Sequence, residues 1–185
     1  NVFLLNNNMK PVDYPESLLF DTGNSMLVYP YWEHIKGLKS YNLIDGSKGN
    51  ITEPFGCPAY RVKGPIILNN QYKIEKCEFF ACYKDNNQGE RTLNFGAGFI
   101  NPSWKTIGLK NTIETPLRYS DCKYLEINYS YNYLNIFENN PPKDYSMMNI
   151  KSNVGIMSSS INYLAMGNDH YPTWIKAIPN YAELD

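Results

Sequence analysis

The chain has 185 residues, a formal net charge of −1 at pH 7, 43% hydrophobic residues and 15% aromatic residues. This length and apolar content are enough for a packed core and exclude an intrinsically disordered chain. The sequence has no cluster of Lys and Arg and no apolar run of about eighteen residues, so it indicates neither a nucleic-acid partner nor a membrane span.

Short apolar segments separated by turn signals make up the first hundred residues. Asn69-Asn70 stands between two of these segments and is typical of a tight hairpin. We predict strands at residues 1–6, 16–20, 26–30, 62–68 and 72–83, one or two helical turns at 31–38, and a loop at 44–56.

The pattern of strands begins again after about residue 112. Residues 124–129 alternate between apolar and polar as a strand does, residues 139–144 are a polar loop, and residues 171–178 have helical spacing after a Pro. Because many short strands are the dominant signal, we expect a mostly β fold with two parts, residues 1–111 and 112–185.

Residues 18–30 read Leu-Leu-Phe-Asp-Thr-Gly-Asn-Ser-Met-Leu-Val-Tyr-Pro and place a carboxylate on a tight turn directly after an apolar strand. Asp21 begins this turn, and Thr22 and Gly23 continue it. An ordinary strand that ends in an Asp-Thr-Gly turn would give the same local pattern. A carboxylate that a strand supports and water can reach is also suited to acid–base chemistry.

This stretch resembles the first active-site motif of the pepsin-like aspartic peptidases. The positions that match it without a gap are Phe20, Asp21, Thr22, Gly23, Ser25, Leu27 and Pro30. The resemblance implies a pepsin-like (acid protease) β-barrel lobe at residues 1–111 and part of a second, related lobe at 112–185. It also implies that Asp21, Thr22 and Gly23 form half of a catalytic site for peptide-bond hydrolysis, which needs neither a cofactor nor a metal.

The resemblance assigns roles to two further segments. Phe95-Gly96-Ala97-Gly98-Phe99 looks like the segment that runs beside the active-site loop in this family. Tyr60 is a candidate for the Tyr of the β-hairpin flap that covers the family's cleft. The usual Tyr-Gly-x-Gly is absent there, and a half-buried Tyr on a strand is the alternative.

The family's chemistry needs two carboxylates about 3 Å apart that share one proton, and the chain contains a single Asp-Thr-Gly. Residues 155–164 resemble the second motif, with Ser158, Ser159 and Ser160 where Asp-Ser-Gly would stand. A Ser hydroxyl cannot share a proton as a carboxyl does, so this reading predicts a degenerate second motif. A polar, serine-rich loop is the alternative. Asn24 also replaces the family's Ser after Asp-Thr-Gly.

Three functions remain open at this stage. In the first, the chain is an aspartic endopeptidase whose second Asp comes from a second copy, in a homodimer or larger assembly, or from sequence outside this chain. In the second, it is a catalytically inactive pepsin-like protein that binds a peptide or protein ligand in the cleft. In the third, it is a structural or surface-assembly component.

Cysteines and sequons indicate the compartment. The candidates for a disulfide framework are Cys57, Cys77, Cys82 and Cys122, which allow three connectivities. Their spacing, and that of the two His residues, does not suit a metal site. Asn50 and Asn128 begin glycosylation sequons. Together these features predict a secreted or secretory-pathway glycoprotein, and the start at Asn1 leads us to expect a processed form or a fragment.

Overall fold

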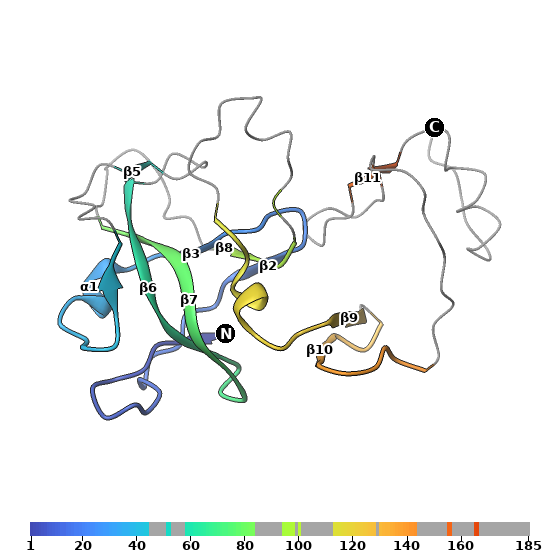
Figure 1. Cartoon of the computed structure of the whole chain (residues 1–185), viewed down its shortest axis with the longest axis horizontal. Coiled ribbons are helices and arrows are strands. Elements are labelled where there is room, and N and C mark those ends of the chain that lie inside the picture. The colour runs from blue at the N-terminus through green and yellow to red at the C-terminus, as the bar shows by residue number, and fades with distance from the viewer. Residues whose placement is uncertain are drawn as a thin grey trace.

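A computed structural model describes residues 1–44, 58–83, 94–98, 100, 113–128 and 130–143, and the backbone of 51–52, 155–156 and 165–166. The fold is mostly β, as the sequence predicts, and its main sheet curls into a half-barrel (Figure 1). No helix in this part of the chain is long or apolar enough to cross a membrane.

The main sheet has eight strands. Six of them form a continuous path in the order β1-β6-β7-β3-β8-β2. The other two, β4 and β5, are short strands that also pair with β6 but lie off this path. The strands are β1 (Val2–Phe3), β2 (Leu19–Asp21), β3 (Leu27–Tyr29), β4 (Asn42–Leu43), β5 (Ile51–Thr52), β6 (Pro58–Leu68), β7 (Tyr72–Cys82) and β8 (Asn94–Gly96).

The β6–β7 hairpin contains the two longest strands of this sheet. Its two strands pair antiparallel from Leu68↔Tyr72 to Ala59↔Cys82. Asn69 and Asn70 form its turn with φ values of 47° and 57°. Two successive positive φ values suit the right-handed twist of the strands, and Asn tolerates them well. The hairpin predicted from Asn69-Asn70 is therefore confirmed.

A crossed arrangement of three strands lies at the other end of the sheet. β2 and β3 follow one another in sequence, yet β8 lies between them (Figure 1). β8 runs parallel to β2, with Phe20↔Phe95 and Asp21↔Gly96, and antiparallel to β3, with Leu27↔Phe95. The segment around Phe95 therefore runs beside the Asp-Thr-Gly loop, as the resemblance of this segment implies.

The core lies inside the curl of the sheet. Tyr29, Phe79, Leu4 and Ile66 are among its largest fully buried side chains. The short helix α1 (Trp32–Ile35) adds Ile35 to it. A second, smaller cluster on the other side of β3 contains Met26, Val28, Ala59, Phe80, Cys82 and Ile113. Since successive strand residues point to opposite faces, β3 contributes to both clusters.

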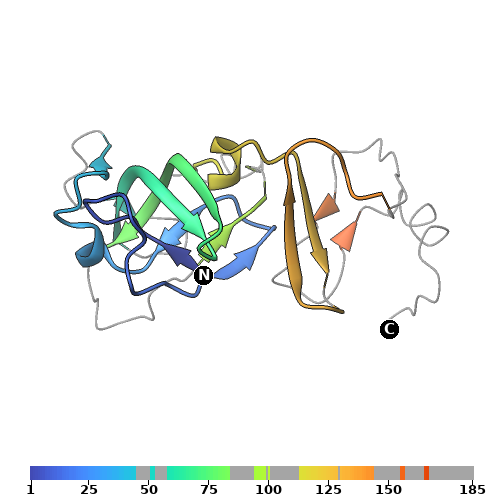
Figure 2. The same cartoon turned by 90° about the horizontal axis from the view of Figure 1, so that it is seen from below.

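Residues after 112 form separate, smaller elements. The 3₁₀ helix η1 (Pro116–Tyr119) packs on β7, and β9 (Tyr124–Asn128) pairs antiparallel with β10 (Tyr133–Phe137). This hairpin stands beside the β2 end of the main sheet (Figures 1 and 2). β11 (Gly155–Ile156) pairs antiparallel with β12 (Ala165–Met166). Whether residues 112–185 are part of a second lobe stays a prediction.

Two parts of the fold differ from the sequence-based expectation. β5 lies inside residues 44–56, which we predicted to be a loop, because two extended residues pair with the start of β6. β10 lies at residues 133–137, where no strand was predicted, and it pairs with β9 along its whole length. The helix predicted at residues 171–178 lies outside the described residues.

Candidate functional site

Asp21 is the last residue of β2, and its side chain closes the turn that follows. Its Oδ1 accepts a hydrogen bond of 2.8 Å from the amide of Gly23. A carboxylate that bonds the backbone two residues later stabilises a turn and fixes its own direction. Asp21 remains partly exposed to solvent, so the turn presents an oriented carboxylate that water can reach.

The segment after β8 braces this turn through the backbone. The amide of Ala97 donates to the carbonyl oxygen of Asp21 over 2.8 Å, and the amide of Gly98 donates to that of Asn24 over 2.9 Å. Both ends of the Asp-Thr-Gly turn are thus tied to one neighbouring segment. The position of the carboxylate therefore depends on residues 94–98 as much as on its own strand.

Two glycines permit this close approach. A Cβ on Gly98 would overlap the carbonyl oxygen of Thr22, and a Cβ on Gly96 would overlap the backbone of Ser25 and Met26. Neither glycine has a positive φ, so both are required here for space and not for backbone conformation. The Gly-x-Gly pattern noted in the sequence thus has a direct physical reason.

Buried amides complete the loop. Asn24 is 4% exposed, and its Oδ1 accepts from the amide of Met26 over 2.9 Å. Asn94 is 5% exposed, and its Nδ2 donates to the carbonyl oxygen of Met26 over 3.3 Å. Asn24 therefore uses its side-chain oxygen to support the backbone of the loop. Asn94 was missed by sequence reasoning, because an Asn at the start of a strand carries no distinctive signal.

Two hydroxyl groups join the loop to residues 113–117. Ser25 is fully buried, and its Oγ donates to the carbonyl oxygen of Ile113 over 2.9 Å. Thr115 is 2% exposed; its Oγ1 donates to the carbonyl oxygen of Gly96 over 2.6 Å and accepts from the amide of Leu117 over 3.3 Å. The start of the C-terminal part is therefore fastened directly behind the candidate site.

An exposed apolar side chain lies on the carboxylate's face of β2. Leu19 is two residues before Asp21, so the two side chains point to the same face of the strand. Phe20 between them points to the opposite face and stacks on Phe95 with ring centroids 5.6 Å apart. Leu19 is 55% exposed, which makes the surface beside the carboxylate partly apolar. Sequence reasoning took Leu19 only as part of the strand.

Tyr60 lies near the open end of the β6–β7 hairpin and not at its turn. It pairs with Ala81, and its ring packs between Trp32 and Tyr83 with centroid separations of 4.6 Å to each. The turn of this hairpin, at Asn69, lies at the opposite end. These contacts agree with a half-buried strand Tyr, and the flap role of Tyr60 stays a prediction.

For the candidate second motif, the structure describes only the two short strands on either side of the serine triplet, β11 and β12. Ser158, Ser159 and Ser160 lie outside the described residues, in the sequence between β11 and β12. β11 and β12 pair directly with each other, whereas β2 and β3 are separated by β8. The described strands around the two motifs are therefore arranged differently.

The cysteines do not form the complete framework that we expected. Cys77 and Cys122 are free thiols, which corrects their assignment as disulfide candidates. Cys77 is buried inside the sheet, where its Sγ donates to the carbonyl oxygen of Gly64 over 3.5 Å, and no second sulfur is needed to satisfy it. Cys82 is buried and stays a disulfide candidate, and Cys57 lies outside the described residues.

The structure describes one of the two glycosylation candidates, Asn128. Asn128 is at the end of β9, where its Oδ1 accepts from the amide of Tyr131 over 3.0 Å and its Nδ2 donates to the hydroxyl of Tyr133 over 3.3 Å. Its side-chain oxygen therefore supports the turn of the β9–β10 hairpin, and its side-chain nitrogen bonds to β10. Asn50 lies outside the described residues. Modification of either residue stays a prediction.

Within the described ranges, no group of three or more His, Cys, Asp or Glu side chains could hold a metal ion. In comparisons with known proteins, no family model, no curated protein and no solved structure matches this chain.

Proposed function

We propose that this chain is a pepsin-like protein of the aspartic endopeptidase type, in which Asp21 is one carboxylate of a catalytic dyad. The observation that carries the proposal is the insertion of β8 between β2 and β3. The segment after β8 braces the partly exposed carboxylate at the end of β2, and an oriented carboxylate that water can reach is suited to be one member of a carboxylate pair. A second carboxylate must come from another copy or from sequence outside this chain.

In that dyad, one proton is shared because two carboxylates about 3 Å apart cannot both ionise. The ionised carboxylate takes a proton from water, and the protonated one polarises the peptide carbonyl. The hydrogen bond from Gly23 to Asp21 orients one member of the pair. The exposed Leu19 supplies an apolar surface suited to a peptide substrate.

The direct test is cleavage of an unfolded protein substrate at acidic pH by the wild type and by Asp21→Asn. Asn keeps the shape of the side chain and an oxygen that can accept from Gly23, so the loop is preserved. We expect the cleavage rate to fall by at least about a hundredfold, as for loss of an acid–base group. Asp13→Asn, an exposed residue on another loop, is the matched control and should cleave normally. Equal rates for wild type and Asp21→Asn would remove Asp21 from catalysis.

The source of the second carboxylate can be tested separately. If two copies of this chain supply one Asp21 each, activity per molecule rises with protein concentration and follows the fraction of dimer. Adding inactive Asp21→Asn protein then lowers the activity of the wild type by forming mixed dimers. Activity per molecule that does not change with concentration would argue against this arrangement.

The second candidate is a catalytically inactive pepsin-like protein that binds a peptide or protein ligand. The direct pairing of β11 with β12 favours it, because the strands near the serine triplet do not repeat the arrangement around Asp21. A peptide with a hydroxyl-bearing tetrahedral isostere distinguishes the two, since a catalytic dyad binds it far more tightly than the parent peptide. Equal affinity for both peptides would favour the binding protein.

A further inference from the structure

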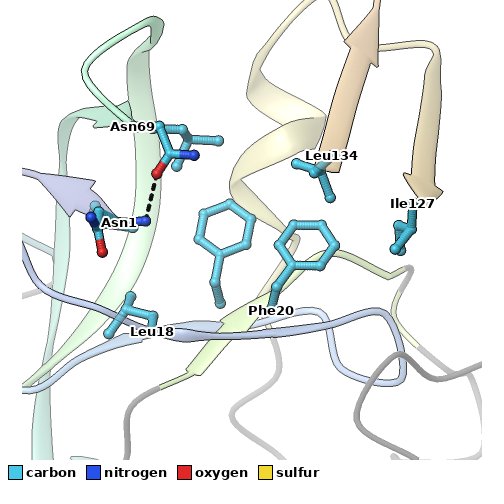
Figure 3. A pocket seen from close by; sticks show the side chains of 9 residues that line it. Asn1, Leu18, Phe20, Asn69, Ile127 and Leu134 are labelled. Atoms are coloured by element: carbon cyan, nitrogen blue, oxygen red, sulfur yellow. Dashed lines mark hydrogen bonds between the residues drawn. The ribbon is translucent and has the colours of Figure 1, made fainter. Parts of the chain in front are cut away.

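An apolar pocket of about 290 Å³ lies on the side of β2 opposite to the carboxylate (Figure 3). The two outer strands of the curled sheet, β1 and β2, approach each other here. An isolated bridge joins Val2 of β1 to Glu16, which precedes β2. The pocket lies beyond this bridge, where Val2, Leu18 and Phe20 are among its lining residues. The stacked rings of Phe20 and Phe95 form the floor of this space.

The β9–β10 hairpin covers the pocket from the other side. Ile127 and Leu134 are paired across the hairpin, and both line the pocket. Leu134 is still 37% exposed, so the hairpin leaves the pocket incompletely filled. The lining is therefore contributed by two separate sheets: the main-sheet side supplies aromatic and aliphatic side chains, and the β9–β10 hairpin supplies aliphatic ones.

Among the described residues that line the pocket, Asn1 and Asn69 are the polar ones, and they lie next to each other. The amino group of Asn1 donates to the side-chain Oδ1 of Asn69 over 2.7 Å, and the backbone amide of Asn69 donates to the carbonyl oxygen of Asn1 over 2.9 Å. The first bond holds the side chain of Asn69 at the rim, and the second holds its backbone. The side-chain nitrogen Nδ2 of Asn69 points away from Asn1, toward the side where Phe20 and Leu134 lie (Figure 3). The rim thus presents a hydrogen-bond donor above an apolar space.

We propose that this pocket binds a small amphiphile, a carboxylate with an aliphatic chain of about ten carbon atoms. A dry apolar cavity of about 150 Å³ holds one benzene molecule, so a pocket about twice as large suits a body of about ten carbons. Ligand pockets commonly combine apolar lining with a few polar groups that fix one end of the ligand. The donor of Asn69 would meet the carboxylate, and the rings of Phe20 and Phe95 would meet the chain. This proposal does not depend on the catalytic role of Asp21.

Calorimetric titration of the full chain with decanoate tests the proposal. We expect one site with a Kd below about 1 mM. Decyltrimethylammonium has the same chain and a head group that cannot accept a hydrogen bond, so it should bind at least about tenfold more weakly. No saturable decanoate binding up to that concentration, or equal binding of both amphiphiles, would overturn the proposal.

Variants show whether the ligand occupies this pocket. Leu134→Trp adds bulk at a partly exposed position and should weaken decanoate binding at least about tenfold. Leu43→Trp is the matched control, because Leu43 is 43% exposed on β4 and lies outside the pocket; its affinity should stay within twofold. If Leu134→Trp does not unfold cooperatively, Ile127→Trp fills the same space from the neighbouring strand.

In the wild type, decanoate should also shift the NMR signals of Phe20, Phe95 and Leu134 and leave Leu43 unchanged. This measurement decides the location of the site even if both Trp variants fail to fold. Equal loss of affinity in the Leu134 and Leu43 variants, or shifts away from these rings, would place decanoate elsewhere and refute the site.

Discussion

The amide of Gly98 donates a hydrogen bond of 2.9 Å to the carbonyl oxygen of Asn24, and this contact brings the backbone after β8 against the Asp-Thr-Gly turn. The contact leaves no room for a side chain on Gly98, since a Cβ there would overlap the carbonyl oxygen of Thr22. The close packing of this segment against the turn therefore requires a glycine at position 98.

Gly98→Ala should move the turn. Because the clash is with backbone, we expect a loss of about 1–3 kcal/mol in the free energy of unfolding and a loss of any activity that depends on Asp21. Urea unfolding and the acid cleavage assay measure the two effects. Gly37→Ala is the control, since Gly37 has φ of 91° and no atoms within 4 Å of an added Cβ. It should cost about 1 kcal/mol through backbone strain and leave activity unchanged. Equal activity in both variants would contradict the proposed brace.

Thr115→Val should weaken the link between the loop and the C-terminal part. The variant keeps the shape of the side chain but leaves the carbonyl oxygen of Gly96 without the 2.6 Å bond from Oγ1. We expect a loss of about 1–3 kcal/mol in the free energy of unfolding. Thr115→Ser keeps the hydroxyl and should lose clearly less. A Val variant as stable as the Ser variant would show that the hydroxyl is unimportant.

Tyr41→Phe should destabilise the N-terminal strands. The buried hydroxyl accepts from the amide of Leu5 over 2.8 Å and donates to the carbonyl oxygen of Pro65 over 2.6 Å. Removing it leaves two buried backbone groups unsatisfied, at a cost of about 2–3 kcal/mol in the free energy of unfolding. Tyr131→Phe is the control, because Tyr131 is 79% exposed, and it should be neutral in urea unfolding. A neutral Tyr41→Phe would mean that water replaces the hydroxyl.

Stability should fall in alkaline solution. Burial raises the pKa of Tyr29 and of Tyr41 above the ordinary value of 10.0. In the unfolded chain both hydroxyls ionise near that value, while in the folded chain they stay protonated, so ionisation favours unfolding. Their contribution is complete below about pH 10 and is lost as the pH rises further, by up to about 1.4 kcal/mol per pH unit for each group. Urea midpoints between pH 9 and 11 measure this loss, and Tyr41→Phe should show a shallower slope. An identical slope in the variant would refute the role of Tyr41.

The two free thiols should differ in reactivity. Burial raises the pKa of the Cys77 and Cys122 thiols, so little thiolate is present near pH 8 and both react slowly with iodoacetamide. Cys122 is partly exposed and Cys77 is buried, so Cys122 should react first and Cys77 only on unfolding. Mass spectrometry follows the order. With Cys77 and Cys122 free, Cys57 and Cys82 are the two candidates left for a disulfide. If they are joined, unfolding without reductant should yield two alkylated cysteines; four would refute that pairing.

The sequence predicts the local features of this fold better than its long-range pairings. The Asn69-Asn70 turn follows from residues that tolerate positive φ, and β2 follows from an apolar run that ends at Asp21. β10 could not be predicted in the same way, because only its pairing with β9 stabilises residues such as Asn135 in an extended form. Secondary structure of this kind is decided by the partner strand and not by local propensity.

The candidate site shows the same division. Asp21 and its turn can be read from adjacent residues, and the family resemblance also pointed to the segment of Phe95. The roles of Asn94 and of the bond from Ser25 to Ile113 depend on groups that are distant in sequence. The free state of Cys77 could not be read from the count of cysteines, because it follows from burial inside the sheet.

The insertion of β8 between β2 and β3 also has a consequence for the order of folding. β8 follows β3 in sequence only after the whole β6–β7 hairpin, so the pairing of Asp21 with Gly96 closes a long loop. Contacts between residues far apart in sequence form slowly, since the entropy of loop closure must be overcome first. During synthesis on the ribosome, the Asp-Thr-Gly turn would thus leave the exit tunnel long before the strand that shapes it. In pulse-labelled hydrogen exchange, the amides of Gly96, Ala97 and Gly98 should gain protection later than those of the β6–β7 hairpin.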